Sequence, residues 1–174
     1  MGLLEPDGRY RRGDGEVPLR AVPGRLIGIA RKPRSRGQVE LLDHAAVGVD
    51  TGIAGDHRGA IRPGKSGRRQ VTIMAAEDWV AVTAELGKTI GWEQRRVNLL
   101  SEGIDLPREP GSRLRIGGVV LEITGECDPC SRMEEIATGL KGALIPGWRG
   151  GRISKVIEGG TIALGDEIEI GVSV

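Results

Sequence analysis

The sequence predicts a mostly β domain, closed or partly closed into a small barrel, with two or three short helices. Valine, isoleucine and leucine supply 45 of the 174 residues, whereas phenylalanine is absent and only four residues are aromatic. Branched aliphatic side chains suit pleated surfaces better than helices. The chain also holds 29 glycines and 9 prolines, which divide it into short apolar runs. Short strands joined by many tight turns are therefore the expected architecture.

The first 23 residues differ from the rest of the chain. They carry seven of the glycines and prolines and show little apolar periodicity. We expect residues 1–23 to form a loosely ordered N-terminal arm, followed by a single barrel domain over residues 24–174.

From residue 24 onward, apolar runs flanked by turn formers predict strands. The expected strands cover residues 25–30, 38–42, 47–53, 70–74, 113–116, 119–123, 153–157, 161–164 and 167–170. Gly117-Gly118 separates two of these runs and predicts a hairpin turn, and Gly159-Gly160 predicts the same arrangement near the C-terminus.

The clearest helix is predicted over residues 75–86. The segment is rich in alanine and glutamate, has two acidic residues in its first turn and stops at Gly87. Trp79, Val82 and Leu86 fall at helical spacing, so we expect them to face the core.

Composition and charge exclude several classes of function. The formal net charge is only +1, so no global field attracts nucleic acid or acidic membrane. No apolar run approaches the roughly 20 residues that a membrane span needs, and the N-terminal stretch lacks the apolar region of a secretory signal. We therefore expect a cytoplasmic protein with neither a nucleic-acid nor a membrane partner.

Residues 59–66 satisfy the P-loop pattern G-x-x-x-x-G-K-[ST], but their surroundings argue against it. A P-loop needs an apolar strand before it and a helix after it, so that backbone amides converge on phosphate. Here a polar segment precedes the pattern and a β-type run follows. The basic residues of this glycine-rich loop remain suited to a small anion, such as a cofactor phosphate.

Cys127 and Cys130 form one C-x-x-C pair, which cannot staple distant parts of a fold. Residues 129–137 predict a short helix, with Asp128 as its cap and Pro129 at its first position. Cys130 would then lie in the first turn, where the helix dipole favours a reactive thiolate or soft-metal ligand.

Other readings of the cysteine pair stay open. Cys127 is either a resolving partner for Cys130 or a buried small hydrophobic residue. Both cysteines are equally consistent with an inert structural role, and a disulfide between them would make a redox switch. A zinc site fits poorly, because the spacing of His44 and His57 is far wider than in closed sites.

Several segments, in this order and spacing, resemble the MOSC domain, named for the C-terminal domain of molybdenum-cofactor sulfurase. The resemblance runs from about residue 24 to residue 170. The segments that carry it are residues 52–58, 69–73, 96–104, 111–117, 129–130 and 149–166.

The resemblance implies a β-barrel-like fold and a site built around Cys130. The family is taken to use this cysteine to carry sulfur, as a persulfide, or to coordinate the molybdenum of a pterin cofactor, molybdopterin. Both roles agree with thiolate chemistry. The residues that the resemblance assigns to cofactor binding are Asp56, His57, Arg58, Arg69, Arg96 and Asn98.

Plainer interpretations exist for some of these residues. Members commonly read Gly-Asp-Arg-His where this chain has Gly-Asp-His-Arg, so the sequence leaves open whether His57 or Arg58 faces the site. Asp56 would also serve as the cap of a turn. Arg96 and Asn98 would also fit a surface arginine and a turn asparagine.

We expect a cofactor-binding or sulfur-carrier protein that receives sulfur from a partner such as a cysteine desulfurase. A first alternative is a complete molybdoenzyme that reduces N-hydroxylated compounds. The sequence shows no flavin, haem or iron–sulfur motif, so this alternative needs a separate electron-donating reductase. A second alternative is a non-catalytic ligand-binding module with inert cysteines.

Overall fold

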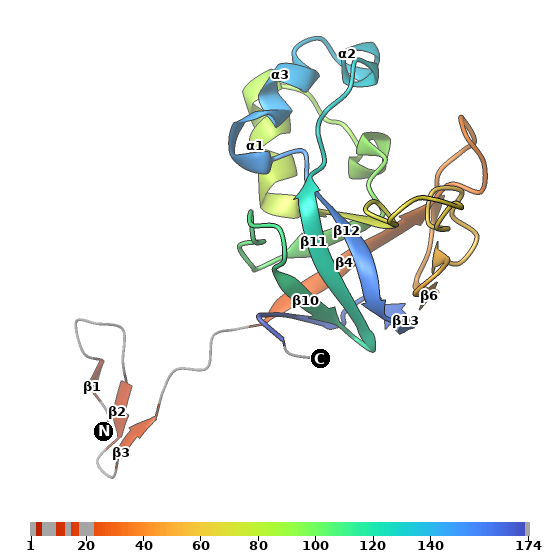
Figure 1. Ribbon diagram of the computed structural model, residues 1–174. Coiled ribbons are helices and arrows are strands. Elements are labelled where there is room, and N and C mark those ends of the chain that lie inside the picture. The colour runs from red at the N-terminus through yellow and green to blue at the C-terminus, as the bar shows by residue number, and fades with distance from the viewer. Residues whose placement is uncertain (1–2, 5–9, 13–14, 18–22, 173–174) are drawn as a thin grey trace.

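The computed structural model describes residues 3–4, 10–12, 15–17 and 23–172. Its main feature is a closed ring of strands (Figure 1). These strands are β4 (Gly24–Arg31), β8 (Val71–Ala75), β9 (Leu99–Glu102), β10 (Arg113–Ile116), β11 (Val119–Glu126), β12 (Arg152–Glu158) and β14 (Glu167–Ile170). Their order is β14-β10-β11-β12-β8-β9-β4, and β14 pairs with β4 to close the ring. All pairs in the ring are antiparallel except β8 with β9. The predicted mostly β, barrel-like fold is confirmed.

The remaining strands lie outside the ring. They are β1 (Leu3–Leu4), β2 (Tyr10–Arg12), β3 (Gly15–Val17), β5 (Glu40–Leu41), β6 (His44–Gly48), β7 (Gly52–Ile53) and β13 (Gly160–Ala163). β5 pairs with β4 at the end of the sheet order, and β13, β6 and β7 form a separate sheet. β1, β2 and β3 form a small antiparallel sheet within the N-terminal arm. Residues 1–2, 5–9, 13–14 and 18–22 of that arm lie outside the described part of the chain, and so does the expectation that the arm is loosely ordered.

The helices gather at one end of the barrel (Figure 1). They are α1 (Ala76–Leu86), α2 (Arg132–Ile136), α3 (Leu140–Leu144) and the 3₁₀ helices η1 (Trp92–Arg95) and η2 (Pro146–Trp148). The predicted helix 75–86 is confirmed. It ends at Gly87, which has a left-handed backbone and donates its N–H to the carbonyls of the last turn. Trp79 and Val82 are buried, as their spacing predicts.

Two apolar cores share the barrel wall. One fills the ring and is built almost wholly of aliphatic side chains, including Leu26, Ile73 and Ile123. The other lies between the wall and the helices and includes Met74, Trp79 and Met133 with other side chains. β8 serves both cores, because successive side chains of a strand point to opposite faces. All five of its residues are therefore buried.

The predicted hairpin at Gly159-Gly160 is wrong, because β13 pairs with β6 and not with β12. These glycines instead allow three backbones to approach closely. A Cβ on Gly159 would lie 2.9 Å from the Val47 carbonyl oxygen, and one on Gly160 would lie 2.7 Å from that of Gly118. The single strand expected over residues 47–53 is also wrong: the end of β6 and β7 occupy this stretch as an antiparallel pair.

The predicted helix over residues 129–137 begins later than expected. α2 starts at Arg132, and no side chain caps it. The preceding residues form a turn in which the Cys130 carbonyl accepts the Met133 N–H at 3.0 Å. Asp128 is thus not a cap, and Cys130 lies ahead of the helix, not in its first turn. The helix-dipole argument for a reactive Cys130 thiolate therefore does not hold.

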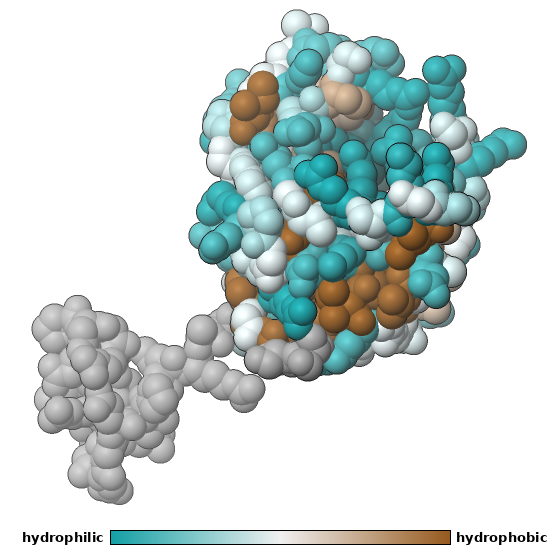
Figure 2. Space-filling model, viewed as in Figure 1, coloured by the Kyte–Doolittle hydropathy of each residue, from teal (hydrophilic) through white to brown (hydrophobic). Residues whose placement is uncertain are grey.

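Hydrophilic side chains dominate the face of the molecule in Figure 2, with a smaller group of hydrophobic residues low on the barrel. Within the part of the chain that the structure describes, no helix is long and apolar enough to cross a membrane.

Candidate functional site

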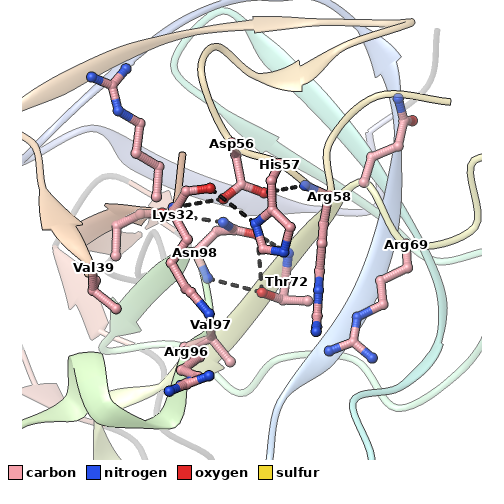
Figure 3. A pocket seen from close by; sticks show the side chains of 13 residues that line it. Lys32, Val39, Asp56, His57, Arg58, Arg69, Thr72, Arg96, Val97 and Asn98 are labelled. Carbon is pink, nitrogen blue, oxygen red and sulfur yellow. Dashed lines mark hydrogen bonds between the residues drawn. The ribbon is translucent and has the colours of Figure 1, made fainter. Parts of the chain in front are cut away.

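A pocket opens at the rim of the barrel, where the end of β4 meets the loop before β8 and the segment before β9 (Figure 3). Its lining consists of Ala30, Arg31, Lys32, Val39, Asp56, His57, Arg58, Arg69, Gln70, Thr72, Arg96, Val97 and Asn98. The structure thus brings together all six residues that the resemblance assigns to cofactor binding. Their role in binding a cofactor stays a prediction.

Asp56 organises the backbone of the pocket. Its carboxylate accepts the N–H of Lys32 at 2.9 Å and the N–H of Arg58 at 3.3 Å. The residue therefore acts as a turn cap, one of the two interpretations that the sequence left open. Asp56 thereby holds Lys32 and Arg58, which come from distant segments of the chain, at the same pocket.

His57 has a defined orientation. Its backbone N–H donates to the Lys32 carbonyl at 2.8 Å, and its ring Nδ1 lies 3.0 Å from the same oxygen. A carbonyl only accepts hydrogen bonds, so we assign the proton to Nδ1. Nε2 does not share this carbonyl. It accepts a hydrogen bond when the ring is neutral and donates one when the ring is charged. Both His57 and Arg58 line the pocket, so the exchanged order of these residues removes neither from it.

Asn98 ties three strands together beneath the pocket. Its side-chain oxygen accepts the backbone N–H of Thr72 at 3.0 Å and the Thr72 hydroxyl at 3.1 Å. Its side-chain nitrogen donates to the carbonyl of Ala30 at 3.1 Å. β4 and β8 are thereby fixed against the start of β9. These contacts make Asn98 a positioning residue for the basic side chains around it.

Arg96 follows η1 with a φ of 66°. This left-handed backbone is uncommon for a residue with a side chain and costs about 1 kcal/mol or more. The turn places an exposed arginine on the pocket directly before the buried residues Val97 and Asn98. Strain of this kind is concentrated at functional sites in proteins.

The pocket holds an excess of positive charge. Lys32 is only 7% exposed, and its burial lowers its pKa, an effect that Arg96, Arg58 and Arg132 strengthen. Burial likewise lowers the pKa of Arg58, and Arg69 adds to the effect. In both residues burial opposes the charged form, and neighbouring arginines oppose it further.

Negative charge is scarce at the same place. Within the described lining, Asp56 is the one carboxylate, and backbone N–H groups already engage it. Arg31 also lines the pocket, but it is paired with Glu40 at 2.7 Å. The arrangement is therefore suited to an anionic ligand.

Sequence reasoning missed Lys32. It lies at the end of β4, 24 residues before Asp56, and only the folded chain brings the two together. The available signal was a pair of basic residues, Arg31 and Lys32, directly after an apolar run. A strand end of this kind places charge at a sheet rim.

The two cysteines occupy different surroundings. Cys127 follows β11 and is fully buried, with its Sγ 3.5 Å from Nη2 of Arg95 and 3.6 Å from Nη2 of Arg69. Its burial agrees with the interpretation as a small core residue. Cys130 is exposed on the turn before α2 and is not part of the pocket lining. Arg132, two residues later, contributes to lowering the pKa of Lys32, so positive charge from this turn acts on the pocket.

A phosphate-bearing cofactor fits the donors present, since guanidinium and ammonium groups are the usual ligands of phosphate. The apolar part of the lining is aliphatic, so it offers no aromatic face to stack on a pterin ring. Among the described residues no group of three or more His, Cys, Asp and Glu side chains is arranged to hold a metal ion. A metal at this site would therefore need ligands from its cofactor as well.

Comparison with known families gives a direct result. The family model for the MOSC domain matches residues 54–169, about two thirds of the chain. The chain belongs to the MOSC domain family. The matched range holds Cys130 and all six predicted cofactor-binding residues, whereas Lys32 lies before it.

Solved structures share the fold of this MOSC domain. The YuaD protein from Bacillus subtilis superposes with a TM-score of 0.69 at 20% identity, over 88% of this chain and 98% of that one. YiiM from Escherichia coli gives a TM-score of 0.63 at 14% identity, over 86% of this chain and 71% of that one. YiiM from Geobacillus stearothermophilus gives 0.63 at 14%, over 86% and 76% of the two chains. A search of curated protein sequences found no match.

Proposed function

We propose that this MOSC domain binds a molybdenum cofactor, molybdopterin, through its phosphate, and that Cys130 is the thiol that ligates molybdenum or carries sulfur. The observation that carries the proposal is the cationic pocket, in which Lys32, Arg58, Arg69 and Arg96 face one already engaged carboxylate. An anion relieves their mutual repulsion. When bound, the cofactor supplies a redox-active molybdenum centre.

Different residues of the chain have different roles in binding the cofactor. Lys32, Arg58 and Arg96 bind the phosphate through charge-assisted hydrogen bonds. Asp56 and Asn98 hold the segments that carry these cations. His57, whose Nδ1 is engaged by a carbonyl, presents Nε2 for one further hydrogen bond.

The exposed Cys130 suits transfer of sulfur from a partner that carries a persulfide, such as a cysteine desulfurase. The Cys130 thiolate attacks the outer sulfur of the donor persulfide, the donor S–S bond breaks, and a new S–S bond forms on Cys130. The donor leaves as a thiolate, so atoms and electrons balance. Both cysteines are free thiols, which suits the reducing cytoplasm that we propose as the site of action.

The test is to purify the protein from a host that makes molybdopterin and to measure bound pterin, bound molybdenum and the mass of the intact chain. We expect pterin in the wild-type protein, with molybdenum or the mass of one added sulfur atom. Lys32→Met with Arg58→Met should lose the pterin. Cys130→Ser should keep the pterin and lose the added sulfur or reduce the molybdenum.

Cys127→Ala is the matched control, because it removes the buried thiol and leaves Cys130 in place. Wild-type protein without pterin, molybdenum or added sulfur would contradict the proposal. If Cys130→Ser matched the wild type in every measurement, the domain would be a ligand-binding module with inert cysteines.

A further inference from the structure

A second basic groove adjoins the pocket. The two share Arg58, Arg69 and Gln70 in their linings. The groove lies along residues 58–70, the stretch that contains the P-loop-like pattern, and no helix follows that pattern because β8 begins at Val71. It has ≈ 1090 Å³ of empty volume, including open solvent, against ≈ 470 Å³ for the pocket. The groove is therefore open to solvent and accessible to a small-molecule ligand.

The segment that forms the groove is anchored to the body of the domain. The buried Gln70 donates to the carbonyls of Val49 at 2.6 Å and Gly59 at 3.3 Å, and accepts the Val156 N–H at 2.8 Å. The Thr124 hydroxyl donates to the Arg68 carbonyl at 2.5 Å. These bonds hold both ends of the segment beside the pocket.

Three further cations line the groove: Arg62, Lys65 and Arg68. Residues 57–69 contain no acidic residue, and among the described residues none of the three cations forms an ion pair. Positive charge thus continues from the pocket into the groove, and the two sets of cations meet at Arg58 and Arg69. A single molecule with two anionic groups matches this arrangement better than a single phosphate does.

We propose that the groove over Arg62, Lys65 and Arg68 is a second anion subsite beside the pocket, so that a small molecule with two linked phosphate groups binds with one group in the pocket and the other in the groove. A nucleoside diphosphate or a dinucleotide has this chemistry. The inference rests on the proposed function in one respect, the binding of an anion in the pocket. It adds a second subsite outside that pocket.

Calorimetric titration at constant ionic strength tests this proposal, with inorganic phosphate, pyrophosphate, AMP and ADP as probes. The wild-type protein should bind pyrophosphate about tenfold or more tightly than phosphate, and ADP more tightly than AMP. Arg62→Ser with Lys65→Ser should remove most of this preference without changing the affinity for phosphate. Both residues are exposed, and thermal unfolding of the variant checks that the fold is unchanged.

Lys88→Ser with Lys141→Ser is the charge-matched control. Both lysines are exposed, Lys88 after α1 and Lys141 within α3, and neither lines the pocket or the groove. This control should keep the preference of the wild type. If the groove variant and the control preferred pyrophosphate equally, the second subsite would be overturned while the anion site in the pocket remained.

If the wild-type protein bound none of the four probes, the anion site on which the proposed function rests would fail as well. The remaining outcome is a preference for pyrophosphate without one for ADP over AMP. It would overturn the assignment to a diphosphate within a larger molecule, because only the free anion would then enter the groove.

Discussion

Two groups of basic side chains in this domain differ in what compensates their charge. Arg152 is fully buried in the barrel wall, where it donates to the carbonyls of Leu106 at 2.8 Å, Pro107 at 3.0 Å and Trp148 at 3.2 Å. Asp78 lies 3.7 Å away. Burial still lowers the pKa of Arg152, but the chain supplies a partner for each of its nitrogens.

The pocket cations have no such set of partners. Lys32 is nearly as buried, yet the charged groups that influence it most are Arg96, Arg58 and Arg132. The contrast separates an arginine that stabilises the fold from cations to which the proposed function assigns a ligand. A buried charge that the chain satisfies is structural, whereas a cluster of uncompensated charges indicates a binding site.

The largest expected effect is on the structural side of this contrast. Arg152→Met should lower the free energy of unfolding by about 3–5 kcal/mol, because three carbonyls and Asp78 lose their partner inside the barrel wall. Arg58→Met, at the exposed pocket rim, should change it by less than about 0.5 kcal/mol. Urea denaturation of both variants measures the difference. If both variants lost the same free energy of unfolding, the structural arginine and the pocket cations would not differ in the way described.

The second effect is stabilisation by anions. Phosphate at 100 times its dissociation constant should raise the free energy of unfolding by about 2.7 kcal/mol, because the folded chain alone forms the pocket. Arg58→Ala with Arg96→Ala should abolish this gain, and Lys88→Ser should not. Thermal unfolding at constant ionic strength, with chloride as the reference anion, separates binding from screening. The contrast fails if phosphate and chloride stabilise the protein equally.

A third effect concerns Arg95, which is 4% exposed and belongs to the structural group. It donates to the carbonyls of Cys127 at 2.8 Å and Gly150 at 3.1 Å. Arg95→Met should cost about 2 kcal/mol, because two buried carbonyls lose a donor. It should also speed the reaction of a thiol reagent with Cys127, measured by mass spectrometry under native conditions. An unchanged rate would mean that Arg95 does not hold this segment closed.

The smallest effect has the opposite sign. Lys32→Met should raise the free energy of unfolding at neutral pH by about 1 kcal/mol at most, because a buried and uncompensated charge is removed. The fold lowers the pKa of Lys32 below the ordinary 10.5, so at alkaline pH the unfolded chain binds more protons than the folded one. The free energy of unfolding of the wild type should therefore approach that of Lys32→Met as the pH rises toward 10.5.

Urea denaturation at several pH values, for the wild type and Lys32→Met, measures this convergence. A constant difference between the two proteins across that range would contradict it. The same variant should bind phosphate more weakly, so stability and binding are expected to change in opposite directions.

Much of the barrel was predictable from the sequence because its strands are marked locally. Alternation and turn residues located β4, β10, β11 and β14 to within a few residues. The partner of β13 was not predictable in this way. The glycines at 159 and 160 look like a hairpin turn, but their function is a close approach to backbone segments more than 40 residues away.

The site was partly predictable for a similar reason. The family motifs located Asp56, Arg96 and Asn98, which the structure brings to one pocket. Lys32 lies outside those motifs, and only the fold brings it to Asp56. The prediction of a reactive Cys130 thiolate depends on a helix that starts at Pro129, but the structure places the helix start three residues later, because the residues after Pro129 form a turn first.

The left-handed backbone of Arg96 has a consequence for mutational scans. Glycine adopts this conformation without strain, so a screen that scored only thermal stability would favour Arg96→Gly. A screen that scored phosphate binding would reject the same change, because it removes a pocket cation. Position 96 should therefore rank oppositely under the two selections, and positions that behave in this way outline the functional surface of the domain.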